Sequence, residues 1–166
     1  MKSSQTSRKI LVPCDGSKPS AYALMKAVEL FVPTDNGANT KQTEIILLYA
    51  VPNIEVPLQL VVAESAQTIT YIQQMYSYLR DRACEMLQEL ADKCVNNKDR
   101  FTVRLEILYG SPAEKIVEFA NKEKVDAIVM GNIGLSGFAK LKALGSVSRS
   151  VSERASIPVM IVPYSQ

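Results

Sequence analysis

Short runs of apolar residues recur along the chain, separated by longer stretches in which apolar residues return every three or four positions. The runs are rich in β-branched residues and are bounded by proline or glycine, which is typical of strands. Runs that are apolar throughout indicate strands buried on both faces of a parallel sheet. The predicted strands are Ile10–Val12, Ile45–Val51, Phe101–Tyr109, Val125–Met130 and Val159–Val162.

The intervening stretches carry signals for helices. Ser17 is a good N-cap with Pro19 in the first turn, and Ser111 followed by Pro112 repeats that pattern. A long helix is predicted over about Glu64–Asn96, and a last helix opens at Gly145 and Ser146. Strand and helix thus alternate to a closing strand, which predicts a single α/β domain with helices on both faces of an open parallel sheet. Each crossover should be right-handed.

Composition narrows the class of protein. The chain has 166 residues, which suits one domain, and its formal charge of +2 is too small to indicate a nucleic-acid or membrane partner. Residues 1–7 are expected to be a disordered tail, and residues 8–166 the domain. Neither a secretory signal nor a membrane-length apolar run is found, so we expect a cytoplasmic protein.

The absence of histidine and the spacing of the cysteines exclude several kinds of catalytic and metal site. Histidine is absent, which removes Ser-His and Cys-His nucleophile systems and zinc sites built on imidazole. The three cysteines form no CxxC pair, so they predict buried or half-buried apolar residues rather than disulfides. We assign no catalytic acid–base pair and no protein metal site.

The most informative stretch follows the fourth predicted strand. Val129 and Met130 lead into a loop with Gly131 and Gly134, and the next helix starts at Gly145. Glycine lets a ligand approach the backbone, and a helix start offers unpaired N–H groups, which together favour phosphate. Ser146 and Ser148 add hydroxyl groups, and Lys140 and Lys142 lie within the loop. The glycine spacing alone fits a flexible connection with a serine N-cap equally well.

The loop fits neither of the common phosphate-binding motifs. It does not follow the first strand with G-x-G-x-x-G, and no G-K-[ST] ends it. Instead, residues 130–137 and 144–162 together resemble the C-terminal signature of the universal stress protein family. Residues 10–17, 46–51 and 109–112 resemble the first strand and turn, the second strand and a later turn of that family.

This resemblance implies a Rossmann-like five-stranded parallel sheet in the order 3-2-1-4-5. It also implies the ATP-binding branch, with ATP, ADP or AMP as ligand and Mg²⁺ accompanying a triphosphate. The family pattern is G-x2-G-x9-G-[ST], whereas ten residues separate Gly134 from Gly145 here. In this order strands one and four are neighbours with diverging connections, which is where open α/β sheets bind ligands.

Matching the family residue by residue gives the predicted nucleotide site. Pro13, Cys14 and Asp15 match the adenosine end, and Ala50 matches a residue that lines the adenine. The phosphate positions are matched by Gly131, Gly134, Gly145, Ser146, Val147 and Ser148, with Met130 beside them. The alternative role for Asp15 is to accept hydrogen bonds from backbone N–H groups of its own turn.

The resemblance also predicts how the chain assembles and how it acts. It implies a homodimer that pairs the last strand, Ile157–Val162, with its copy, and an otherwise exposed edge strand favours such pairing. The predicted function is a stress-response regulatory module that changes conformation or dimer contacts with bound nucleotide and is read by an unidentified protein partner. Two alternatives remain: an interaction protein with a weak or empty site, and a slow ATPase.

Overall fold

The computed structural model describes residues 7–33, 42–53, 66–94, 101–133 and 144–164. Five strands form one parallel sheet in the order β3-β2-β1-β4-β5. The strands are β1 (Arg8–Pro13), β2 (Thr43–Val51), β3 (Phe101–Tyr109), β4 (Ala127–Gly131) and β5 (Val159–Val162). The helices between them are α1 (Lys18–Phe31), α3 (Ala66–Cys94), α4 (Pro112–Glu123) and α5 (Ser146–Arg154). The predicted fold class and strand order are confirmed.

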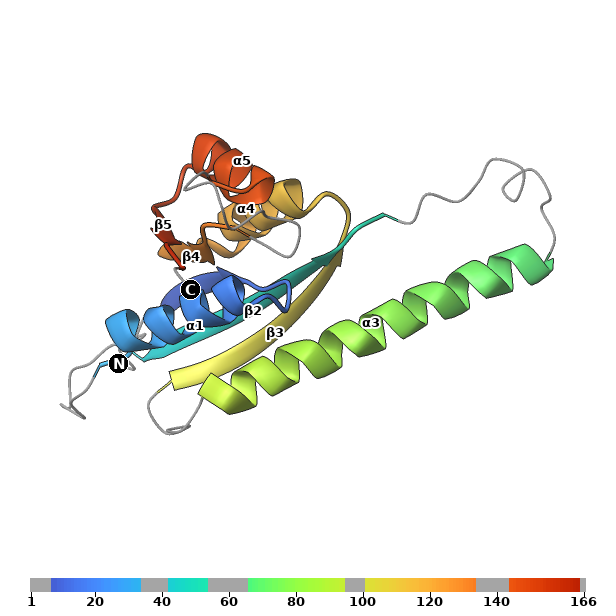
Figure 1. Ribbon diagram of the computed structural model, residues 1–166, viewed down its shortest axis with the longest axis horizontal. Coiled ribbons are helices and arrows are strands. Elements are labelled where there is room, and N and C mark those ends of the chain that lie inside the picture. Colours follow the sequence, from blue (N-terminus) through green and yellow to red (C-terminus); the bar gives the residue numbers. More distant parts are fainter. Residues whose placement is uncertain (1–6, 34–41, 54–65, 95–100, 134–143, 165–166) are drawn as a thin grey trace, which may run out of the picture.

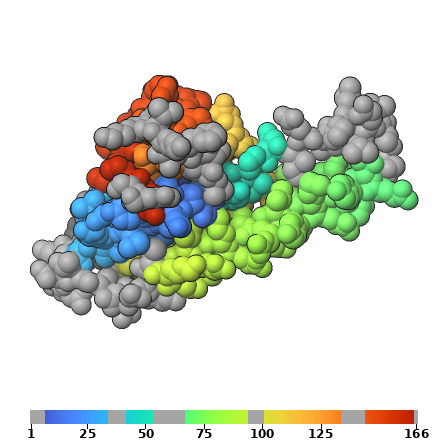
Figure 2. Space-filling model, in the orientation of Figure 1, coloured from blue at the N-terminus to red at the C-terminus, as the bar shows by residue number. Residues whose placement is uncertain are grey.

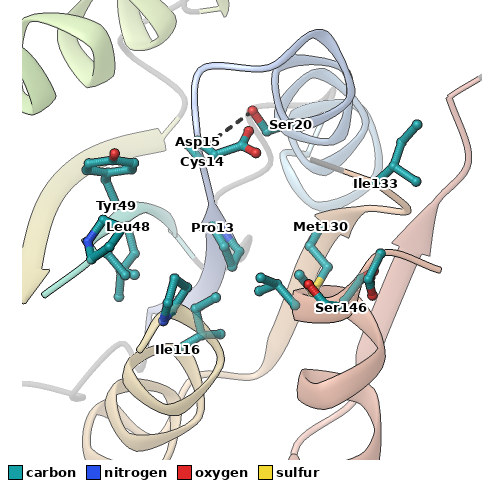
Figure 3. A pocket seen from close by; sticks show the side chains of 17 residues that line it. Pro13, Cys14, Asp15, Ser20, Leu48, Tyr49, Ile116, Met130, Ile133 and Ser146 are labelled. Atoms are coloured by element: carbon teal, nitrogen blue, oxygen red, sulfur yellow. Dashed lines mark hydrogen bonds between the residues drawn. The ribbon is translucent and has the colours of Figure 1, made fainter. Parts of the chain in front are cut away.

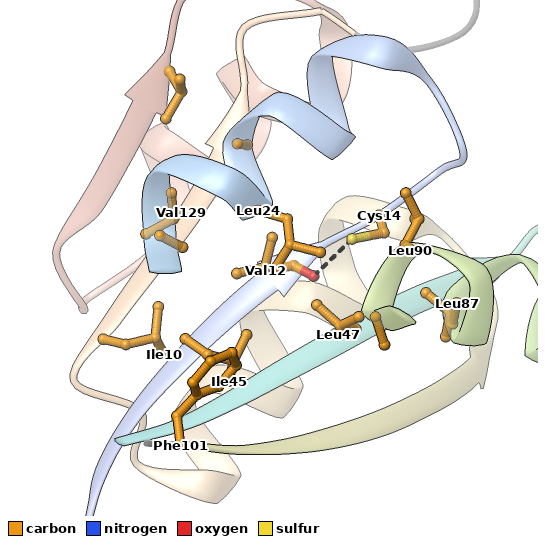
Figure 4. Close-up of a cluster of buried hydrophobic side chains, with 14 of the residues drawn as sticks. Ile10, Val12, Cys14, Leu24, Ile45, Leu47, Leu87, Leu90, Phe101 and Val129 are labelled. Atoms are coloured by element: carbon orange, nitrogen blue, oxygen red, sulfur yellow. Dashed lines mark hydrogen bonds between the residues drawn. The ribbon is translucent and has the colours of Figure 1, made fainter. Parts of the chain in front are cut away.

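Helices cover both faces of the sheet, as Figure 1 shows. Successive strand residues point to opposite faces, so Ile10 and Val12 pack under α1 and α3 while Leu11 packs under α4 and α5. Figure 4 shows the first of these two layers, in which Leu24 of α1 and Leu87 of α3 meet the strands. The continuously apolar strands β1, β2 and β4 are therefore buried on both sides, whereas the equally apolar β5 at the sheet edge is only partly buried.

The helix starts follow from their local sequences. The Ser17 side chain accepts a hydrogen bond from the Ser20 N–H at 3.2 Å, which caps α1, and Gly16 before it has φ of +81°. Ser111 occupies the N-cap position of α4 with Pro112 as the first helical residue, but its side chain makes no capping bond. Gly110 has φ of +134°, so the turn before α4 requires a glycine.

Three strands differ in extent from the prediction: β1 is longer at both ends, β2 begins two residues earlier, and β4 lies further along the chain. The fourth strand was expected over Val125–Met130, but β4 runs from Ala127 to Gly131. Lys124 ends α4 in the left-handed conformation with φ of 52°, and the Val125 N–H bonds back to the Ala120 carbonyl. Val125 is buried because it completes the end of the helix, so its apolar character does not mark a strand position.

Several expectations fall outside the described residues. These are most of the expected N-terminal tail, the loop containing Gly134, Lys140 and Lys142, and residues 54–65 of the connection after β2. In the described part of the chain, no helix is both long enough and apolar enough to cross a membrane.

Candidate functional site

A pocket opens at the carboxyl ends of β1, β2 and β4, with a volume of about 430 Å³. Ligand pockets in proteins span roughly 300–1,000 Å³, so this one is large enough for a small organic molecule. Residues from the starts of α1, α4 and α5 complete its wall. The pocket lies where α1 and α5 diverge to opposite faces of the sheet, which is the switch point expected of this strand order.

Most of the pocket wall is apolar. Pro13 at the end of β1, Met130 at the end of β4 and Ile116 of α4 surround the opening in Figure 3. Ala50 of β2 and Val147 of α5 add two more apolar surfaces. Such a wall suits an apolar or weakly polar part of a ligand.

Asp15 lies at the polar rim, in the turn between β1 and α1. Its Oδ1 accepts a hydrogen bond from the Ser17 N–H at 3.0 Å, and its own N–H lies 3.5 Å from the Ser20 hydroxyl. The carboxylate therefore holds the turn that positions the start of α1. It also lines the pocket. The turn role predicted for Asp15 is thus observed, and its contact with a ligand stays a prediction.

Gly131 is required by packing as well as by its place in the pocket. A Cβ at this position would lie 3.0 Å from the backbone carbon, the carbonyl oxygen and the Cβ of Pro19. The glycine thus lets the first turn of α1 approach the end of β4 closely. This contact brings the β1 turn and the β4 end together at the pocket.

The start of α5 presents backbone N–H groups to the same pocket. Gly145 is the N-cap and has no side chain to satisfy them, so the N–H groups of Ser146, Val147 and Ser148 lack a side-chain cap. The first N–H groups of any helix have no acceptor within the helix and carry the positive end of its dipole. Ser146, Val147 and Ser148 all line the pocket, which makes this turn its anion-attracting side.

Two hydrogen bonds fix this turn against β4. The Gly145 N–H donates to the Asn132 carbonyl at 2.7 Å, and the Ser148 hydroxyl lies 2.9 Å from the same oxygen and 3.0 Å from the Gly145 carbonyl. Ser148 is buried, and its single hydroxyl proton is used within the protein. Its contribution to an anion must therefore come from its backbone N–H.

The charge of the pocket is negative in its described part. Asp15 is the one charged residue among the described residues that line it, and none of them is lysine or arginine. The positive end of α5 must therefore supply the attraction for an anion from this part of the wall. In the described residues, no group of three or more acidic or cysteine side chains is placed to hold a metal ion.

An ion cluster with shifted pKa values lies elsewhere, on β1, β3 and α4. Arg104 bonds Glu123 at 3.0 Å and Glu106 at 2.6 Å, and Lys9 reaches Glu123 at 3.4 Å. The bond from Arg104, with help from Lys9, lowers the pKa of Glu123 below its usual value, and Glu123 raises the pKa of Arg104. None of these residues lines the pocket, and their ion pairs link β1, β3 and α4.

The structure gathers the predicted site residues in one place. Pro13, Cys14, Asp15, Ala50, Met130, Gly131, Gly145, Ser146, Val147 and Ser148 all line the pocket. Gly134 lies outside the described residues. Sequence reasoning missed the remaining lining residues, namely Ser20, Leu48, Tyr49, Pro52, Pro112, Ile116 and Ile133. Proximity to recognised features could have flagged Pro112, which follows an N-cap serine, and Ile133, which sits in the glycine loop.

Comparisons with protein families, with related sequences and with solved structures all point to one family. The universal stress protein family matches residues 6–163. Universal stress protein YxiE of Bacillus subtilis is 32% identical over 162 residues, covering 93% of this chain and 97% of the relative. The solved structure of MJ0577 from Methanocaldococcus jannaschii superposes with a TM-score of 0.71 at 28% identity, covering 96% of this chain and 97% of the other.

A second solved structure is informative about the fold. A universal stress protein in complex with cAMP has a TM-score of 0.62 at 23% identity and covers 96% of this chain and 98% of its own. It shares the Rossmann-like arrangement of strands and helices described above. From the match over nearly the whole length, together with the sheet order and the switch-point pocket, the chain belongs to the universal stress protein family.

Proposed function

We propose that the pocket binds an adenine nucleotide, with AMP, ADP or ATP as ligand, and that the chain is a regulatory module of the stress response. One observation carries the proposal: an apolar pocket of suitable volume ends at the uncapped start of α5. The base would lie against the wall formed by Pro13, Ala50 and Met130. Asp15 would contact the ribose, and the N–H groups of Ser146, Val147 and Ser148 would receive phosphate oxygens.

The ligands bound to two structurally similar proteins support this assignment. Proteins of the same fold have been solved in complex with cAMP and with AMP. We propose that Mg²⁺ binds only when a triphosphate is bound, because Mg²⁺ usually binds one or two carboxylates together with phosphate oxygens. Asp15 is the acidic group that the described wall provides. The proposed output is a nucleotide-dependent change of surface or dimer contacts, and the proposed place of action is the cytoplasm.

Calorimetric titration tests the proposal. We expect saturable binding of AMP or ATP, and a rise in melting temperature, since a ligand at about 100 times its Kd stabilises the native state by roughly 2.7 kcal/mol. UMP should bind more weakly than AMP, because its smaller ring covers less of the apolar wall. No heat and no thermal shift with any adenine nucleotide at millimolar concentration would refute the assignment.

One observation favours a second candidate, an interaction protein with a weak or empty site. The described pocket wall contains Asp15 and no lysine or arginine. An anion there is therefore attracted only by the helix dipole and by backbone N–H groups. Adenine nucleotide that co-purifies with the native protein would argue against this candidate. Its absence, combined with millimolar affinity in the titration, would favour it.

We also propose that β5 pairs with its copy in a homodimer. In the described sheet β5 pairs with β4 alone, so its outer edge has unpaired backbone groups, and Met160 on it is exposed. Light scattering should give twice the protomer mass, and Met160→Lys should lower it by placing charge at the edge. A wild-type protein of one protomer mass at tens of micromolar would contradict the proposal.

A further inference from the structure

The longest helix extends far beyond the sheet that it covers. Figures 1 and 2 show the first half of α3 projecting past the ends of β2 and β3. No described side chain from Gln67 to Arg82 is buried, and the first buried residue of the helix is Ala83. Those sixteen residues span about 24 Å of helix. Only the second half, with Leu87 and Leu90, belongs to the core.

This projecting half has a broad apolar face. Ile72, Tyr76 and Leu79 continue at helical spacing the line that Ala83, Leu87 and Leu90 direct at the sheet. Tyr71 and Tyr78 widen that line on one side, and both are highly exposed, at 58% and 63%. Ile69, on the other side, is 54% exposed. At 100° per residue these positions cover about half of the helix circumference, far more than the sheet requires.

One ring contact anchors the projecting half. Tyr76 packs edge-on against Tyr109, the last residue of β3, with ring centroids 5.4 Å apart. The contact ties the middle of the stretch Gln67–Arg82 to the carboxyl end of β3. The preceding turns, with Ile69, Tyr71 and Ile72, lie beyond it.

The same segment carries no charge. From Ala66 to Leu79 there is no Asp, Glu, Lys or Arg, whereas Arg80, Asp81, Arg82 and Glu85 follow directly. The buried centres of protein interfaces are depleted in charge and enriched in tyrosine and methionine. A helix that lies on a lipid surface instead carries lysine and arginine on its polar face, and a nucleic-acid partner also requires basic residues.

We propose that the projecting halves of α3 from two copies of this chain pack against each other in an antiparallel pair. A twofold axis brings each segment against itself, so any charge at its centre would meet its like. The neutral stretch avoids that repulsion, and the charged residues from Arg80 onward would flank the neutral first turns of the partner copy. Two faces roughly 24 Å long and roughly 10 Å wide bury less than the roughly 1,600 Å² of a standard interface. We therefore expect affinity of order tens of micromolar.

Sedimentation of matched variants tests this proposal. Tyr71→Glu with Tyr78→Glu places two charges on the apolar face. Ser77→Glu with Cys84→Glu places two charges at the same spacing on the opposite, exposed face of the helix. Between about 5 and about 500 micromolar, the mass of the wild type and of the Ser77/Cys84 variant should rise to at least twice that of the Tyr71/Tyr78 variant. A dimer held through β5 carries two α3 faces, so pairing through α3 would link such dimers and raise the mass further.

Three results would overturn the proposal. The first is equal mass for the wild type and the Tyr71/Tyr78 variant at every concentration, with both shown to be folded by circular dichroism. The second is a Ser77/Cys84 variant whose mass stays as low as that of the Tyr71/Tyr78 variant at every concentration. The third is a wild-type mass that stays constant while the protein binds neutral phosphatidylcholine vesicles through Tyr71 and Tyr78, which would assign the face to lipid.

Discussion

Glycine has two different roles among the residues that line the pocket. At Gly131 the absence of a side chain admits the backbone of Pro19 at 3.0 Å from the Cβ position. At Gly145 a Cβ would meet its nearest neighbours, Ile133 and Asn132, at 3.4 and 3.5 Å, which is close to ordinary contact. Its φ of −62° suits any residue. The first glycine is thus demanded by packing, and the second leaves room for an alanine.

These two glycines give a matched prediction for stability. Gly131→Ala should lower the free energy of unfolding by about 1–3 kcal/mol, because the new methyl group must displace the backbone at Pro19. Gly145→Ala should change it by less than about 1 kcal/mol. Urea denaturation of both variants measures the difference. Equal losses at the two positions would contradict the packing role of Gly131.

The sequence predicted which residues line the pocket better than it predicted the hydrogen bonds that these residues make. The sequence motifs indicated Asp15 and Ser148, and both line the pocket. Neither motif reveals that the Ser148 hydroxyl is bonded to the Asn132 carbonyl. Leu48 could not be predicted either, because it enters the site through the register that pairs it with Pro13 across β1 and β2. Register depends on the assembled sheet, and periodicity along one strand does not contain it.

Among the elements, α5 is the one whose position carries the functional proposal. Its first turn faces the pocket with backbone N–H groups, and Gly145 before it has φ of −62° and ψ of 162°. That extended conformation is the one required before a proline. Proline is also well tolerated as the first helical residue, so a single backbone donor can be removed without breaking the helix.

Ser146→Pro removes one N–H group together with the hydroxyl, while Ser146→Ala removes the hydroxyl alone. Stability should hardly change in either variant, because proline fits this helix position. We expect Ser146→Pro to weaken AMP or ATP binding by about 5- to 30-fold beyond Ser146→Ala, the effect of about 1–2 kcal/mol for a hydrogen bond to a charged group. Calorimetric titration measures it, and identical affinities would remove this N–H group from the phosphate site.

The ion cluster around Glu123 links β1, β3 and α4. Its carboxylate accepts from Arg104 and Lys9, which lowers the pKa of Glu123 in the folded protein. A lowered folded-state pKa gives stability at neutral pH that is lost as pH falls through the folded pKa. The cluster is partly exposed to solvent, with 20% of the Glu123 side chain accessible, so the contribution should be modest.

Glu123→Gln should therefore destabilise the protein at pH 7 by about 0.5–1 kcal/mol. The difference from wild type should shrink as pH falls from the ordinary range of a glutamate toward the lowered pKa of Glu123, where the folded-state carboxyl group becomes protonated. Urea denaturation at several pH values measures both proteins. A difference that stays constant from pH 7 to pH 3 would show that charge is not its cause.

At the scale of the whole molecule, the alternation of strands and helices was sufficient to predict one α/β domain with a parallel sheet. The strand order came from family resemblance, and the structure confirms it. The projection of α3 could not be predicted, since the apolar periodicity of Ile72 and Leu79 continues into Leu87 and Leu90 without a break. Where the sheet ends beneath a helix is a property of the assembled fold.

The proposed nucleotide site depends on backbone N–H groups at the start of α5 that receive the phosphate of an adenine nucleotide beside an apolar wall. Nuclear magnetic resonance of the ¹⁵N-labelled protein, titrated with AMP, tests this claim most directly. We expect saturable shifts centred on the amides of Ser146, Val147 and Ser148, with Ala50 responding to the base. An unchanged spectrum at millimolar AMP, or shifts confined to residues away from this pocket, would contradict the account.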